Sequence, residues 1–139
     1  MSAAPILLDT CAALWLMAGA AMARPALSAI NRTQDSDAGV HVSPISAWEI
    51  GLLLSKRRIT LAMTAEEWFE TLLGMPGVRL ALMPPKVLIA SSFLPGAPPT
   101  DPADRIVAAT AREFGMAVVT RDRALRAYAN GGHIDLIVC

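Results

Sequence analysis

The order of hydrophobic and polar positions predicts short buried strands that alternate with helices. Short, mainly apolar runs lie at residues 5–8, 40–43, 78–83, 116–119 and 134–138, and turn-forming or polar residues border each of them. The longer segments between these runs carry apolar residues at helical spacing. Such alternation is typical of a parallel sheet that helices cover on both faces. We therefore predict an α/β protein, a three-layer α/β/α sandwich with a central, mostly parallel sheet.

The helices expected between the strands have clear start and stop signals. Thr64 with Glu67 forms a capping box, Asp101-Pro102 is a strong N-terminal pattern, and Gly115 is a typical helix stop. The helix that Pro44 opens is expected to bury one apolar face that includes Trp48. The expected helices span residues 12–23, 25–32, 44–58, 64–73, 84–93, 101–114 and 122–130. A chain of 139 residues is of the size of a single domain, which we predict to span residues 1–139.

Four acids are predicted to meet at one edge of this sheet. Asp9 and Asp122 follow predicted strands, while Glu49 and Asp104 lie in early turns of helices. In parallel α/β sheets, ligands bind in the crevice outside the carboxyl ends of the strands. Carboxylates that gather there repel one another unless a cation neutralises them, and oxygen ligands without His or Cys favour Mg²⁺ or Mn²⁺ over zinc. Such ions suit the hydrolysis of phosphodiesters.

Each acid also has a purely structural interpretation. Asp9 and Asp122 can simply cap the helices that follow them, and Glu49 can interact with a helix dipole. Asp101 is assigned mainly to capping, so Asp104 is assigned to metal only because of its partners. The joint placement of the acids carries the metal hypothesis, and none of them carries it alone.

The segments around these acids resemble the PIN-domain nucleases, and within them the VapC-like toxins of toxin–antitoxin pairs. The resemblance covers nearly the whole chain. It rests on four short segments, which are Ile-Leu-Leu-Asp-Thr at residues 6–10, Ser-Ala-Trp-Glu-Ile at 46–50, Asp-Pro-Ala-Asp-Arg-Ile at 101–106 and Val-Val-Thr-Arg-Asp at 118–122.

The resemblance implies both the site and the activity. It implies that Asp9, Glu49, Asp104 and Asp122 form an acidic quartet that binds Mg²⁺ or Mn²⁺, and that the Thr120 hydroxyl supports this site. It further implies hydrolysis of RNA, a homodimer, and inhibition by a separately encoded antitoxin.

The sequence departs from the common pattern of this family at four places. One is the helix after Glu49, where residues 52–59 do not reproduce the usual Lys and Gly. Cys11 stands where many members have His, Pro99-Thr100 stands where a His is frequent, and Ala103 replaces a bulky aromatic residue. Because the acids are intact, these departures concern substrate selection and partner contacts more than metal binding.

The charge composition implies that any binding of nucleic acid depends on local basic patches rather than on the net charge of the chain. Twelve basic and 12 acidic residues give a formal net charge of zero, so no overall field announces a nucleic-acid binder. Arg105, Arg121 and Arg123 lie beside the acids and are candidates for holding RNA phosphates. Solvated arginines, or ion pairs of these arginines with Asp122 and Glu113, are the other interpretation.

The remaining composition indicates a folded protein of the cytoplasm. The hydrophobic fraction of 54% argues against disorder. The two cysteines lie far apart without metal-ligand or redox spacing, which favours free thiols in a reducing compartment. The longest uncharged apolar run, residues 11–23, is too short to span a bilayer, and we expect no contact with a membrane.

Three functional hypotheses follow. The leading one is a metal-dependent endoribonuclease that acts as a toxin, and the second is a non-catalytic PIN-like binding module that works through protein partners. The third is a phosphoryl-transfer domain with Asp9 as nucleophile. The third is weak because Cys11 stands where a phosphatase needs a second acid, and because neither Lys56 nor Lys86 follows a late predicted strand as a receiver domain requires.

Overall fold

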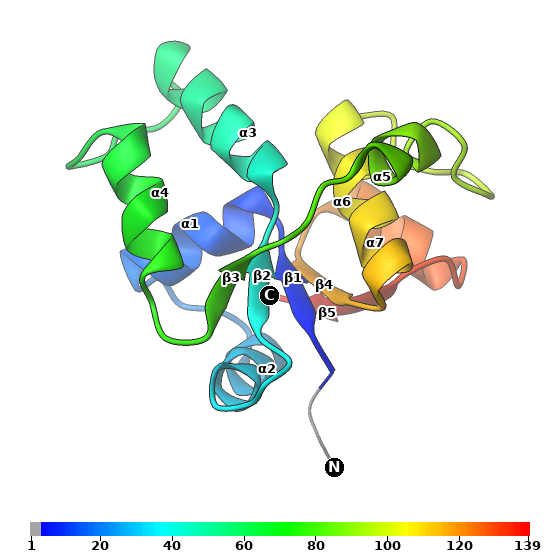
Figure 1. Ribbon diagram of the computed structural model, residues 1–139, viewed down its shortest axis with the longest axis horizontal. Coiled ribbons are helices and arrows are strands. Elements are labelled where there is room, and N and C mark those ends of the chain that lie inside the picture. The colour runs from blue at the N-terminus through cyan, green and yellow to red at the C-terminus, as the bar shows by residue number, and fades with distance from the viewer. Residues whose placement is uncertain (1–3) are drawn as a thin grey trace.

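A five-stranded parallel sheet forms the centre of the computed structural model, which describes residues 4–139 (Figure 1). The strand order is β3-β2-β1-β4-β5, so the first strand of the chain lies in the middle. All neighbouring strands run parallel, with Ile6 of β1 opposite Val40 of β2 and Ala117 of β4. The strands are β1 (Ile6–Leu8), β2 (Val40–Val42), β3 (Val78–Leu80), β4 (Ala117–Thr120) and β5 (Asp135–Val138).

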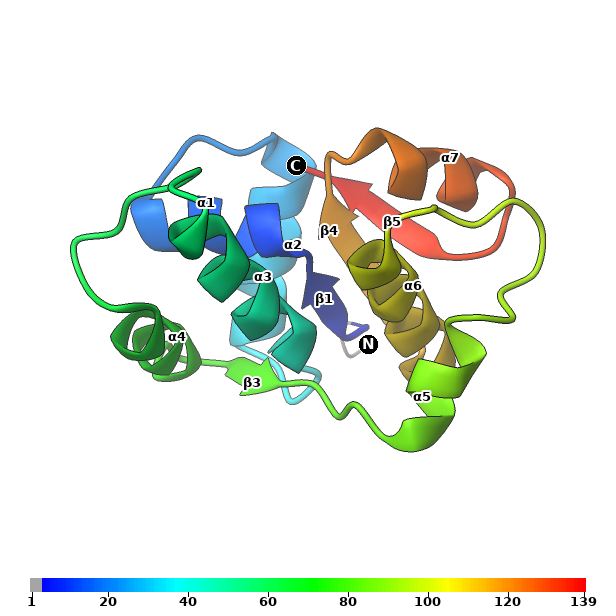
Figure 2. The ribbon, with the colours of Figure 1, turned by 90° about the horizontal axis from the view of Figure 1, so that it is seen from above.

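Helices cover both faces of this sheet, which makes the architecture the expected three-layer sandwich. Helices α1, α2 and α4 lie on one side of the sheet, and α5, α6 and α7 lie on the other (Figure 1). Helix α3 follows β2 and lies across β1 from α6 (Figure 2). The helices are α1 (Thr10–Ala18), α2 (Arg24–Gln34), α3 (Pro44–Ser55), α4 (Ala65–Leu73), α5 (Pro85–Ala90), α6 (Pro102–Phe114) and α7 (Arg123–Asn130).

The alternation of side chains along the strands creates two separate cores. Ile6 and Leu8 of β1 pack on the side of α1, α2 and α4, whereas Leu7 between them packs on the side of α6 and α7. All three side chains are buried, as are the middle residues of β4. This burial on both faces explains why the central strands are continuous apolar runs rather than alternating ones.

Several predicted boundaries were wrong by a few residues. The first helix ends at Ala18 instead of continuing to residue 23, because Gly19 adopts a left-handed conformation with φ of 66° and terminates it. Helix α2 continues two residues beyond its predicted end at residue 32, the third strand ends at Leu80, and α5 ends at Ala90. Ser43 is not part of a strand but caps α3, its hydroxyl accepting from the Ile45 amide at 3.1 Å.

The predicted buried face of α3 was also wrong. Trp48 is 56% exposed, and the residues of α3 that are buried are Ser46 and Ile50. The helix is apolar on nearly its whole circumference, so periodicity did not identify which side meets the sheet. None of the helices described in residues 4–139 has the length and apolar character that a membrane crossing requires.

Candidate functional site

Asp9 lies where the central strand β1 ends and α1 begins. Its Oδ1 accepts a hydrogen bond from the Ala12 amide at 2.8 Å, which caps the helix. Its Oδ2 accepts a hydrogen bond from the hydroxyl of Thr120, at the end of the neighbouring strand β4. The same hydroxyl accepts from the Asp122 amide at 2.9 Å. Thr120 therefore ties two of the acids together, and both Asp9 and Thr120 are buried.

Glu49 is held by a second pair of hydroxyl groups. The Thr10 hydroxyl lies 2.5 Å from Glu49 Oε1 and 2.9 Å from the Ser46 hydroxyl. A hydroxyl has one proton to donate, and the carboxylate is the stronger acceptor, so Thr10 donates to Glu49 and accepts from Ser46. Sequence reasoning did not assign a role to Thr10 or Ser46, although Thr10 directly follows the first acid.

Asp101 and Asp104 lie at the start of α6. Asp101 caps this helix, since its Oδ1 accepts from the amides of Ala103 at 2.8 Å and Asp104 at 3.2 Å. This contact is the capping role expected from the sequence. Asp101 nevertheless borders the same cavity as the four predicted acids, so it adds a negative charge to the site.

Nine side chains line one cavity of about 350 Å³ at the carboxyl ends of β1 and β4. The structure brings all four predicted acids to this cavity, together with Asp101. Asp122 reaches it as the residue that caps α7, with its Oδ2 2.9 Å from the Leu125 amide. The lining residues are Asp9, Thr10, Cys11, Trp15, Glu49, Asp101, Asp104, Arg121 and Asp122.

Burial, with a smaller contribution from neighbouring charges, raises the pKa of three of these carboxylates. Burial, followed by the charges of its four acidic neighbours, raises the pKa of Asp104 to about 7. Burial also raises the pKa of Asp9, although the bonds from Thr120 and Ala12 act in the opposite direction. The pKa of Glu49 is raised for the same reason, against the bond from Thr10. The surroundings of Asp9, Glu49 and Asp104 therefore disfavour their charged forms, which a bound cation would favour.

The donor set of the cavity fits a hard divalent cation. It offers carboxylate and hydroxyl oxygens, which such ions prefer, and no imidazole. Within residues 4–139, however, no three His, Cys, Asp or Glu side chains already stand close enough to hold an ion between them. The oxygens of Asp9 are also engaged by Ala12 and Thr120. Coordination would therefore require the carboxylates to move toward one another.

The three arginines predicted beside the acids have different surroundings. Arg121 lines the cavity, with its guanidinium carbon 3.6 Å from the centre of the Trp15 ring. Arg105 Nη1 donates to the Ser91 carbonyl at 3.4 Å instead, and Arg123 is exposed at the start of α7. Glu113, a predicted partner for these arginines, pairs with Lys86 at 2.6 Å.

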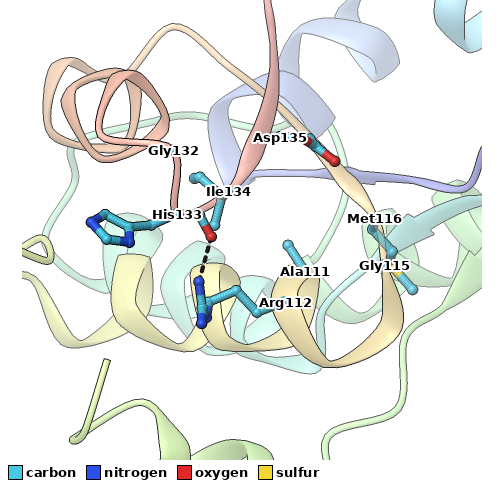
Figure 3. A pocket seen from close by; sticks show the side chains of 8 residues that line it. All are labelled: Ala111, Arg112, Gly115, Met116, Gly132, His133, Ile134 and Asp135. Carbon is cyan, nitrogen blue, oxygen red and sulfur yellow. Dashed lines mark hydrogen bonds between the residues drawn. The ribbon is translucent and has the colours of Figure 1, made fainter. Parts of the chain in front are cut away.

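A second cavity of about 330 Å³ lies at the opposite end of the sheet, where β4 and β5 begin (Figure 3). Its arginine is already engaged, because Arg112 Nη1 donates to the His133 carbonyl at 2.6 Å, and the His133 ring stacks on Tyr128. Asp135 is its only acid. The acidic cavity, with five carboxylates, is therefore the better candidate for a chemical site.

Comparisons with known proteins find similarity over most of the chain. The PIN domain family matches residues 6–131 of the chain. Ribonuclease VapC22 from Mycobacterium tuberculosis (strain ATCC 25618 / H37Rv) is 35% identical over 123 residues, which are 88% of this chain and 91% of that protein. The fold is similar to that of a chain in the crystal structure of VapBC2 from Rickettsia felis bound to a DNA fragment from their promoter. That match has a TM-score of 0.70 and 12% identity, and covers 96% of this chain and 98% of the other.

Proposed function

This chain belongs to the PIN-domain family, and on that premise we propose that it is a metal-dependent endoribonuclease, the toxin of a toxin–antitoxin pair. The observation that carries the proposal is the cavity at the carboxyl ends of β1 and β4, where five carboxylates meet and the pKa of Asp104 is raised to about 7. The similarity to a protein named as a VapC ribonuclease supports RNA as the substrate.

We assign metal binding to Asp9, Glu49, Asp104 and Asp122, and the metal to Mg²⁺ or Mn²⁺. Such an ion, when bound, activates water for attack and stabilises the negative charge that develops on the phosphodiester. The residues of the chain place and support this chemistry. Thr120 holds the Asp9 carboxylate and the Asp122 backbone in register, while Thr10 and Ser46 orient Glu49.

The partners proposed for this toxin are RNA, a separately encoded antitoxin and a second copy of the chain, all in the cytoplasm. Large apolar side chains that are exposed around β3 and α5 support at least one protein contact, because isolated soluble monomers rarely leave such groups together at the surface. These residues are Leu80, Leu82, Leu88, Ile89 and Phe93.

The decisive test compares Asp104→Asn with Asp135→Asn. Asp104→Asn should lower the cleavage rate of single-stranded RNA in Mg²⁺ or Mn²⁺ by at least about a hundredfold, because it removes a metal-binding charge without changing the shape of the side chain. Asp135→Asn makes the same change at the opposite end of the sheet and should leave the rate unaltered. Wild-type cleavage by Asp104→Asn would refute the assignment.

One observation favours a non-catalytic PIN-like binding module as the second candidate. The acids are not close enough to hold an ion as they stand within residues 4–139. A thermal-shift titration with Mn²⁺ separates the two candidates, since a bound ion raises the melting temperature by linkage. A shift in the wild type that Asp104→Asn removes supports the nuclease, and no shift in either protein supports the binding module.

A further inference from the structure

Arg121 occupies an unusual position beside the acidic cavity. It lies between Thr120 and Asp122, two residues that belong to the site, and it is itself exposed. Its guanidinium carbon lies 3.6 Å from the centre of the Trp15 ring, on the first helix of the chain. Cation–π contacts of this kind hold an arginine in place without occupying its N–H donors. The Arg121 side chain also hydrogen-bonds the Cys139 thiol, a contact that opposes the rise that burial causes in the pKa of that thiol. A guanidinium has five N–H donors, so this bond leaves others available.

In the part of the chain that the structure describes, no carboxylate lies within salt-bridge distance of the Arg121 guanidinium. Among residues 4–139, the one pair at salt-bridge distance joins Lys86 to Glu113, which lies near the C-terminal end of α6, whereas the start of that helix borders the cavity. Trp15 thus keeps Arg121 beside the acids but apart from them. Its charge still reaches the site, where it lowers the pKa of Asp9 against the larger effect of burial.

Arg121 is also the single cation among the nine side chains that line the cavity, against five carboxylates. A strand of RNA that approaches this cavity meets repulsion from every acid that a metal does not neutralise. A fixed guanidinium at the rim offers a fork of donors that matches the geometry of a phosphate. The two other arginines near the acids, Arg105 and Arg123, do not line the cavity.

We propose that Arg121, held in place by stacking on Trp15, binds a backbone phosphate of the RNA strand that enters the acidic cavity. The inference rests on the proposed function and deepens it, because it names the residue that binds the substrate. The strand is oriented by a phosphate contact, which carries no information about the base sequence.

The competing role for Arg121 is internal neutralisation of the acids. In that case the arginine offsets carboxylate repulsion in the metal-free protein and has no contact with RNA. The two roles differ in a measurable way. A phosphate contact changes the affinity for RNA and its dependence on salt, whereas an internal counter-charge changes the affinity for the metal.

The test measures binding of a labelled single-stranded RNA by fluorescence anisotropy across a range of KCl concentrations. The Asp104→Asn background prevents cleavage, so binding is read independently of catalysis. In that background Arg121→Ala should weaken binding about tenfold and lower the slope of log affinity against log salt by about 0.7, the loss of one contact to a single strand. The RNA affinity of Arg121→Lys should lie between that of the Asp104→Asn background and that of Arg121→Ala, since lysine keeps the charge but lacks the planar fork of donors.

Two further variants test the stacking on Trp15. Trp15→Phe should weaken RNA binding about threefold, because a smaller ring holds the cation less well. Arg123→Ala, an exposed arginine two residues away, should change binding by about twofold at most. With Asp104 restored, Arg121→Ala should raise KM and leave kcat nearly unchanged, as expected for a contact made equally in the ground and transition states.

Unchanged affinity and salt slope in Arg121→Ala would overturn the inference, as would a background protein that binds no RNA. Tighter binding of Mn²⁺ by Arg121→Ala with unaltered RNA binding would establish internal neutralisation instead. Failure of the wild type to cleave RNA, with the Arg121 effect on binding preserved, would refute the nuclease and leave the phosphate contact standing.

Discussion

The two ends of the sheet contain cavities of nearly equal size, about 350 and 330 Å³, but opposite character. At the carboxyl end, five carboxylates share one space and the pKa of Asp104 is raised to about 7. At the amino end, Asp135 is the single acid that lines the cavity, and Arg112 donates to the His133 carbonyl. The carboxyl end thus holds several like charges close together, whereas the amino end holds one acid.

The two ends therefore differ in role: the carboxylates at the carboxyl end are suited to binding a ligand, whereas the bonded groups at the amino end contribute to stability. Groups that remain poorly compensated in the folded protein cost stability and persist where a ligand completes them. Groups that bond to each other contribute to the free energy of unfolding and need no ligand. Size alone does not distinguish the two cavities, whereas the charge and pairing of their lining residues do.

The largest expected effect lies at the amino end. In Gly96→Ala the new Cβ would lie 2.3 Å from His133 Nε2, at a backbone φ of +72° that disfavours side chains. We expect a loss of about 3 kcal/mol in the free energy of unfolding, from backbone strain and displacement of the stacked imidazole. Urea denaturation measures this loss, while cleavage by the remaining folded protein should stay normal.

Gly132→Ala is the matched control for this substitution. Its φ is +82°, but no atom lies within 4 Å of the position of the new Cβ. The strain alone should cost about 1 kcal/mol. Equal losses in the two variants would contradict the idea that the His133 contact stabilises this end.

At the carboxyl end, Thr120→Val should mainly affect activity. It removes the hydroxyl that donates to Asp9 and accepts from the Asp122 amide, so both acids lose their relative placement. We expect cleavage to fall about tenfold to a hundredfold, because misplaced groups lose much of their effect on rate. Thr110→Val, which removes a buried bond to the Ile106 carbonyl within α6, should reduce stability but not the rate per folded molecule.

The smallest effect is the pH dependence of stability in the metal-free protein. The pKa of Asp104 is raised from an ordinary 3.8 to about 7, so between these values the folded state binds more protons than the unfolded state. The contribution of Asp104 to the free energy of unfolding therefore falls as pH rises through this window. The shift is largely one of burial, and Asp104 remains partly exposed, so we expect about 1 kcal/mol after screening.

Urea unfolding in EDTA at about pH 5 and about pH 8 measures this slope. In Asp104→Asn the curve should be flatter, with greater stability than the wild type at the higher pH. Parallel curves for the two proteins would show that the acids at the carboxyl end do not strain the fold.

Much of the fold followed from the apolar runs. The central strands are buried on both faces, so residues 6–8 and 117–119 had to be almost wholly apolar and were recognisable as strands. Boundaries were less predictable where no polar residue marks them. Residues 18–23 are nearly all small and apolar, and the helix stop at Gly19 depends on a backbone conformation that competes closely with continuation of the helix.

The placement of the acids at one cavity was also predictable, because parallel strands end at the same edge of the sheet. The second role of Asp101 was not, since a capping residue and a cavity residue have the same sequence signature. Nor was the Arg121–Trp15 contact, which depends on how far α1 leans across the end of β4. Contacts between side chains far apart in the chain leave no local pattern to detect.

The strand order β3-β2-β1-β4-β5 has a consequence for the synthesis of the protein. Asp9 emerges early from a ribosome, but its hydroxyl partner Thr120 is 111 residues further along the chain. Three of the five acids of the cavity, Asp101, Asp104 and Asp122, also belong to the last third of the sequence. At about 5–20 residues per second, the nascent chain spends several seconds with only Asp9 and Glu49 of the five cavity acids. A growing chain therefore cannot assemble the cavity next to the messenger that encodes it until translation is nearly complete.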